Sequence, residues 1–191
     1  MSTGLIIALI VIVVAAVVVA AVPGLRARGP QRGRSLKRRF GPEYELAVAR
    51  HNGDAKAAER ELGELVQRHG SLHERPLEPE RRQEYKERWA EAQAHFVESP
   101  EESLREADRL LAELAVERGF PEGGRREEQL EALSVHHPRH VDGYRRVHRA
   151  SAESNGADTE EMRAAIVEAR GLFKELVGFE SSREPALHKG S

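Results

Sequence analysis

The chain has 191 residues, no cysteine and a formal net charge of −2. The absence of cysteine excludes disulfide bonds, thiolate zinc sites and thiol catalysis, and the length allows one modest domain with a tail or membrane anchor. Charge divides the chain into two unlike segments. Residues 1–40 contain seven of the 30 Lys/Arg and no acid, which leaves 23 Lys/Arg against 32 acids, a balance of −9, in residues 41–191.

An apolar segment follows the short, uncharged tail of residues 1–4. Residues 5–22 form an unbroken run of Leu, Ile, Val and Ala, which would span about 27 Å as an α-helix, close to the roughly 30 Å hydrocarbon core of a bilayer. Such a helix has no polar face, so it must be surrounded by apolar material on all sides. Pro23 and Gly24 end the run. The sequence therefore predicts a transmembrane helix over residues 5–22.

The position of the basic residues indicates the orientation of this segment. A cleaved signal peptide begins with a basic region, whereas here all the basic residues follow the apolar run. By the positive-inside rule, the N-terminus lies outside and the C-terminal domain lies in the cytoplasm, as in a single-pass signal-anchor protein of the cell membrane. Cleavage near Val22, which would release an exported helical protein, is the alternative because small residues precede that position.

Residues 23–40 are predicted to be a flexible basic juxtamembrane linker, since Gly, Pro and Ser interrupt any hydrophobic period. The linker would act as a topology signal and a solvated spacer, and its charge would also attract anionic lipid headgroups. No aromatic side chain interleaves with the arginines and the following domain is acidic, so nucleic acid is not expected as a partner. The cations that would lie at the membrane surface are Arg26, Arg28, Arg32, Arg34, Lys37, Arg38 and Arg39.

The acidic remainder, residues 41–179, is rich in Ala, Leu, Glu and Arg and lacks strand-like alternation. We predict an all-α domain, an irregular bundle of about five to seven short amphipathic helices. The first helix begins after Gly41 with Pro42 in its first turn and ends before Asn52-Gly53. Asp54 is placed to cap a second helix that ends at Gly70.

Three further helices are predicted by apolar spacing and by capping signals. After a link between Pro76 and Pro79, one helix carries a stripe formed by Tyr85, Trp89, Ala92 and Phe96. Ser99-Pro100-Glu101-Glu102 is typical of a capping box and begins a helix with Leu104, Ala107, Leu111 and Leu114, which ends at Gly119-Phe120-Pro121. A short helix with Leu130 and Leu133 follows.

Two helices complete the predicted domain. One begins at Pro138, and Asn155-Gly156 ends it. The last is capped by Asp158 or Thr159 and carries Met162, Ile166, Ala169, Phe173 and Leu176 on one face. Residues 180–191 are expected to be a disordered tail. Large aliphatic residues and Phe are few, so the core should be thin and the domain elongated, or completed by a partner.

Histidines are the candidates for chemistry, because His136, His137 and His140 cluster in the sequence. The i, i+4 spacing of His136 and His140 could hold a metal, but Pro138 interrupts the helix between them. We therefore expect solvated or helix-capping histidines, with no catalytic residue, cofactor or metal. Phosphate-binding loops and nucleophile motifs are absent. A metal-dependent or hydrolytic enzyme that uses this histidine region remains the alternative.

Several short segments give the chain a family resemblance that covers about residues 39–178. It resembles an uncharacterised family of small, membrane-anchored or exported, mainly helical proteins of high-GC Gram-positive bacteria. The resemblance implies one architecture and no activity, cofactor or catalytic residue. It is carried by residues 39–44, 75–77, 96–100, 107–110, 118–121, 133–136 and 144–145, together with Tyr85 and Trp89.

The sequence thus predicts a single-pass membrane protein that presents a helical interaction domain at the cytoplasmic face of the membrane. Its expected partners are the lipid bilayer and either another protein or a second copy of the chain. No motif in the sequence indicates an enzyme.

Overall fold

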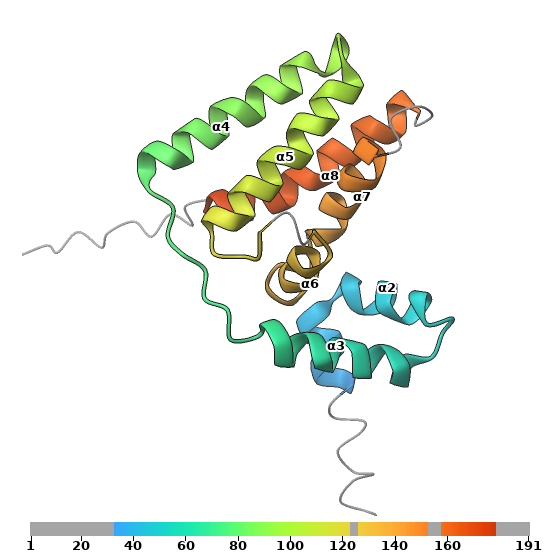
Figure 1. Ribbon diagram of the computed structural model, residues 1–191. Coiled ribbons are helices and arrows are strands. Elements are labelled where there is room, and N and C mark those ends of the chain that lie inside the picture. The colour runs from blue at the N-terminus through green and yellow to red at the C-terminus, as the bar shows by residue number, and fades with distance from the viewer. Residues whose placement is uncertain (1–32, 123–125, 153–157, 179–191) are drawn as a thin grey trace, which may run out of the picture.

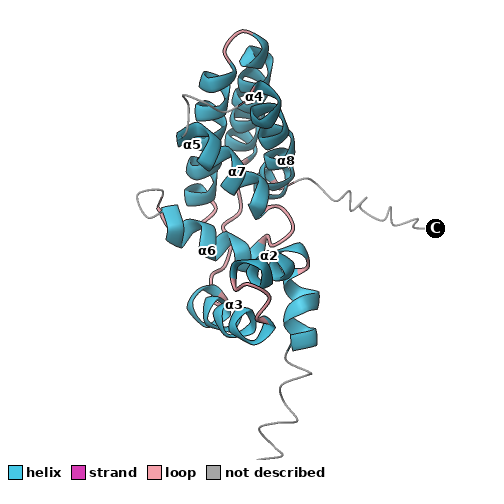
Figure 2. Ribbon diagram, turned by 90° about the vertical axis from the view of Figure 1, so that its right-hand side faces the viewer, coloured by secondary structure: helices cyan, strands magenta, loops and turns pink. Residues whose placement is uncertain are grey.

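Helices dominate the part of the chain that the computed structural model describes, residues 33–122, 126–152 and 158–178, and no strand occurs there (Figure 2). The all-α prediction is confirmed. The first helix covers residues 33–40 and is called the N-terminal helix below. It is followed by α2 (Pro42–Arg50), α3 (Ala55–His69), α4 (Pro79–Ala94), the short 3₁₀ helix η1 (His95–Val97), α5 (Pro100–Glu117), α6 (Arg126–His136), α7 (Val141–Ala152) and α8 (Thr159–Val177).

The helices form two groups that lie end to end and give the molecule an elongated shape (Figures 1 and 2). One group, the bundle, consists of α4, α5, α7 and α8, which pack against one another. The other group, the N-terminal lobe, consists of the N-terminal helix, α2 and α3. Helix α6 lies between the groups and contacts α3 on one side and α7 on the other.

The core of the bundle is built from the apolar stripes that the helical spacing predicts. Tyr85, Trp89, Ala92 and Phe96 of α4 and η1 are all buried, and the Trp89 ring stacks on Phe173 of α8 with 4.5 Å between the ring centroids. Burial also confirms the predicted faces of α5 and α8. Because these helices are amphipathic with a period near 3.6, the stripes alone identify which side faces inward.

A second, smaller core holds the N-terminal lobe together. It contains Leu36 and Phe40 of the N-terminal helix, buried side chains of α2 and α3, and Val135 of α6. The prediction of a flexible linker is therefore wrong for residues 33–40, which are helical. Gly33, Leu36 and Phe40 follow helical spacing and are buried, while the basic residues face solvent. Tertiary packing of this face stabilises the helix, since short helices in isolation are marginal in water.

The helix ends follow the predicted caps at some positions and depart from them at others. The Asp54 carboxylate accepts hydrogen bonds from the backbone N–H groups of Lys56 and Ala57, as predicted. The capping box predicted at Ser99 does not form. The backbone N–H of Ser99 already donates to the carbonyl of His95, 2.9 Å away, across the two-residue turn that joins η1 to α5.

The start of α7 also differs from the prediction. Residues 138–140 form a turn, and the helix begins at Val141 rather than at Pro138. The backbone N–H groups of His140 and Val141 both donate to the carbonyl of His137, which closes this turn before the helix begins.

The predicted transmembrane helix over residues 5–22 lies outside the described residues, as do residues 23–32, the predicted break at residues 155–156 and the tail over residues 180–191. Among the residues that the structure describes, no helix has the length and apolar character needed to cross a membrane.

Candidate functional site

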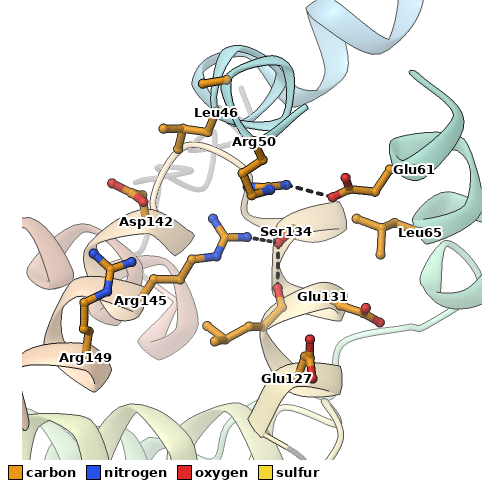
Figure 3. A pocket seen from close by; sticks show the side chains of 12 residues that line it. Leu46, Arg50, Glu61, Leu65, Glu127, Glu131, Ser134, Asp142, Arg145 and Arg149 are labelled. Atoms are coloured by element: carbon orange, nitrogen blue, oxygen red, sulfur yellow. Dashed lines mark hydrogen bonds and ion pairs between the residues drawn. The ribbon is translucent and has the colours of Figure 1, made fainter. Parts of the chain in front are cut away.

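A pocket of about 530 Å³ lies between the N-terminal lobe and α6 and α7, and is called the interlobe pocket below (Figure 3). Helical spacing explains its lining, because each helix presents residues three, four or seven positions apart on one face. The lining residues are Leu46, Ala49 and Arg50 from α2, Glu61 and Leu65 from α3, Glu127, Leu130, Glu131 and Ser134 from α6, and Asp142, Arg145 and Arg149 from α7.

A buried ion pair connects the walls of the interlobe pocket. The Glu43 side chain in the first turn of α2 is completely buried, and Arg145 donates to its two carboxylate oxygens at 2.6 and 2.8 Å. Arg145 also donates to the Ser134 hydroxyl at 2.7 Å, and that hydroxyl donates to the Leu130 carbonyl at 2.6 Å. Arg50 lies 3.5 Å from Glu43. These contacts hold α2, α6 and α7 in a fixed relation around the pocket.

Most charges at the rim of the interlobe pocket are paired. Arg50 donates to Glu61 at 2.8 Å, and Glu131 and Asp142 pair with Arg68 and Arg146 respectively. Arg149 and Glu127 are exposed, and neither has an ionic or hydrogen-bond partner among the described residues. The leucine side chains of the lining add an apolar surface. The pocket therefore offers apolar contact and one unpaired charge of each sign.

The predicted histidine cluster lines a separate open cleft of about 700 Å³, called the histidine cleft below, together with Glu74, Gly171, Lys174, Glu175 and Gly178. His137 is 8% exposed, with Nδ1 2.7 Å from Glu175 and Nε2 3.2 Å from Glu74. Burial alone would lower the pKa of His137, but the two carboxylates outweigh it and raise that pKa. His137 and then Arg118 lower the pKa of Glu74 to about 2.

His137 and His140 share Glu175 as a partner, whereas His136 contacts a backbone carbonyl. His136 Nε2 lies 2.9 Å from the backbone carbonyl of His69, and the His136 ring packs edge-on against Phe120. His140 lies 3.5 Å from Glu175. No group of three metal-ligating side chains occurs within the described ranges. The expectation of solvated or helix-capping histidines is wrong for His137, which is buried and paired with two carboxylates.

The basic residues of the predicted linker divide into two sets. Arg34, Lys37, Arg38 and Arg39 are exposed on the N-terminal helix, whereas Arg26, Arg28 and Arg32 lie outside the described residues. Lys37 pairs with Glu45 at 2.7 Å, and this carboxylate raises the pKa of Lys37. The Arg39 guanidinium lies 6.0 Å from the Phe40 ring centroid.

Sequence patterns did not single out the residues of the buried ion pair. Glu43 in a first helical turn is typical of an acid that complements the helix dipole, and nothing local marks it as buried. Three segments that carry the family resemblance, residues 39–44, 133–136 and 144–145, nevertheless meet here through Glu43, Ser134 and Arg145. That coincidence is the signal from which the site could have been found.

No protein-family model, no curated protein and no solved structure matches this chain.

Proposed function

We propose that this chain is a single-pass membrane protein whose helical domain binds a partner protein at the cytoplasmic face of the membrane. The observation that carries the binding role is the mixed lining of the interlobe pocket. A polypeptide segment offers apolar side chains and charges of both signs, so it can cover Leu46 and Leu130 while it pairs with Arg149 and Glu127. A nucleic acid would instead need an excess of cations.

The buried ion pair supports this role because it makes the pocket largely preformed. Glu43, Arg145 and Ser134 fix the backbones of α2, α6 and α7 without help from a ligand. A binding site whose walls are already ordered loses less conformational entropy on association, which favours affinity at a given contact area. The partner segment therefore adapts to a rigid site.

Site-specific photo-crosslinking in the cells that make the protein tests the binding role. A benzophenone amino acid is placed in the full chain at Ala49, which is exposed and lines the interlobe pocket, or at Val97, which is 86% exposed on η1. We expect a discrete adduct at Ala49 and none at Val97. The substitution Arg149→Glu should reduce the adduct about tenfold, since it reverses the unpaired charge.

The outcomes of that experiment separate the proposed partners. An adduct with the mass of two chains would identify a second copy of the chain as the occupant. Identical adducts at Ala49 and Val97, or an adduct at Ala49 that Arg149→Glu leaves unchanged, would contradict a binding role for the interlobe pocket.

The membrane orientation has its own test, which the absence of cysteine makes simple. Single cysteines are introduced as Thr3→Cys or Ser191→Cys, and intact cells are treated with an impermeant thiol reagent. We expect labelling at position 3 and none at position 191 until the cells are lysed. Labelling at position 191 in intact cells would overturn the proposed orientation, and a product trimmed near Val22 would establish export instead.

A further inference from the structure

The N-terminal helix has two contrasting faces. Leu36 and Phe40 point into the core of the N-terminal lobe and are 8% and 0% exposed. Arg34, Arg38 and Arg39 are exposed on the other side. Packing therefore holds these arginines on a fixed surface, called the basic face below, rather than on a freely moving chain.

The charges of the basic face are largely uncompensated by their surroundings. Lys37, the remaining cation of this helix, pairs with Glu45, so it is not counted among the uncompensated charges of the basic face. Arg34, Arg38 and Arg39 have no ionic or hydrogen-bond partner among the described residues, and the Arg39 guanidinium lies near the Phe40 ring. Residues 34 and 38 are one helical turn apart, so their side chains emerge on the same side.

Chain length places this surface close to the proposed membrane anchor. Ten residues separate Val22, the last residue of the apolar run, from Gly33, the first described residue of the helix. Even a fully extended chain of ten residues spans no more than about 36 Å. The N-terminal helix also lies at one end of the elongated molecule, whereas η1, between α4 and α5, lies at the other (Figure 1).

We propose that the basic face rests on anionic phospholipid headgroups beside the anchor, so that the domain stands on the membrane with η1 directed away from it. This proposal depends on the membrane tether of the proposed function. We assign a lipid surface as the partner of the basic face. The electrostatic attraction of cationic side chains is strongest where a continuous negative potential lies within a Debye length, about 8 Å at physiological salt. A tethered domain cannot move far from such a surface.

Lipid nanodiscs that contain the full chain provide the test. The substitutions Ser35→Cys, on the exposed side of the N-terminal helix, and Val97→Cys, on η1, each introduce a single site for a fluorophore. Quenching by a headgroup-attached quencher is measured in phosphatidylcholine discs with and without phosphatidylglycerol. We expect quenching at position 35 to rise severalfold with the anionic lipid and to fall at high salt, and position 97 to stay unquenched.

Matched triple variants separate the position of the charges from their number. Changing Arg34, Arg38 and Arg39 to Gln should reduce the dependence on anionic lipid severalfold. Changing the exposed Arg105, Arg163 and Arg170 to Gln removes three positive charges from α5 and α8. This control variant should keep the dependence of quenching on anionic lipid. Circular dichroism verifies that each variant keeps its helical content.

Each result decides the proposal. Equal quenching at position 35 in both lipids, or quenching that the first triple variant leaves unchanged, would show that the basic face is not on the lipid and would leave the tether intact. A chain that is recovered free of the discs would overturn the tether and, with it, the docked orientation.

Discussion

Glu43 shows how one side chain can join parts of the chain that are remote in sequence. Its partner Arg145 lies 102 positions later, and the pair closes the contact between α2 and α7. A buried carboxylate without its cation is strongly destabilising, because its desolvation is then uncompensated. The sequence could place Glu43 in a first helical turn, but its burial depends on where α7 arrives, which no local pattern encodes.

Removal of the cation tests this pair. We expect Arg145→Met to lower the free energy of unfolding by about 3–5 kcal/mol, measured by urea denaturation of the full chain in detergent micelles. The exposed Arg105 pairs with Glu101 one turn away, so Arg105→Met should cost less than about 0.5 kcal/mol. Adding Glu43→Leu to Arg145→Met should recover much of the loss. Equal effects of the two single variants would contradict the role of the pair.

His137 predicts how stability depends on pH. Its raised pKa means that its contribution is complete below the unfolded pKa of about 6.5 and is lost as the pH rises through the folded value. Glu74, with a pKa lowered to about 2, contributes fully above pH 4.5 and loses its contribution as the pH falls toward 2. The histidine cleft is therefore most stabilising between about pH 4.5 and 6.5.

The variant His137→Gln provides the measurement. Unfolding midpoints of the full chain should fall from pH 6 to pH 8 in the parent, and this fall should be smaller in His137→Gln. The exposed His73 has no ionic partner among the described residues, so His73→Gln is the matched control. If the stability of the parent protein rises from pH 6 to pH 8, protonated His137 does not stabilise the fold as predicted.

At the scale of the helices, periodicity predicted the faces of α4, α5 and α8 because each depends only on residues three or four positions apart. The prediction of a capping box at Ser99 was wrong because the backbone N–H of Ser99 donates to a carbonyl of the preceding helix, η1. The close packing of α7 on α8 was not predictable, since it depends on Gly143. A Cβ atom at Gly143 would lie 2.6 Å from the backbone nitrogen of Ala169.

Two glycine variants test this helix contact. Gly143→Ala should destabilise the protein by about 1–3 kcal/mol despite the better helix propensity of alanine, because rigid backbone atoms of α8 block the new methyl group. At Gly171 the obstructing group is the flexible side chain of His140, so Gly171→Ala should be neutral or stabilising by up to about 1 kcal/mol. Thermal unfolding of both variants provides the comparison, and similar losses would contradict the close approach of α7 and α8.

At the scale of the whole molecule, the thin core inferred from composition corresponds to an elongated arrangement with two apolar clusters instead of one (Figure 1). The cluster of the N-terminal lobe is much the smaller, and α6 contributes to both, with Val135 on one side and Leu133 on the other. Composition could indicate that the core is thin, but not that it is divided, because division depends on which helices contact one another.

Native-state hydrogen exchange of the full chain in micelles should reveal this division. We expect amides in α2 and α3 to open with a lower free energy than those in α5 and α8, since less apolar surface holds them. Arg145→Met should lower protection in α2 and α3 more than in α8. Uniform protection across both groups, before and after this substitution, would contradict two separately stabilised clusters.

The burial of Leu36 and Phe40 determines where the polypeptide can be cut. The change in charge near residue 40 invites a recombinant fragment that starts at Gly41, yet that truncation would strip two side chains from the cluster around Ala58 and Leu62. Phenylalanine removal from a core typically costs about 3–5 kcal/mol, a large fraction of the roughly 5–15 kcal/mol that stabilises a native domain. A recombinant fragment should therefore begin no later than Gly33. If a shorter fragment misfolds, the cause would be the loss of these core side chains and not a property of the whole protein.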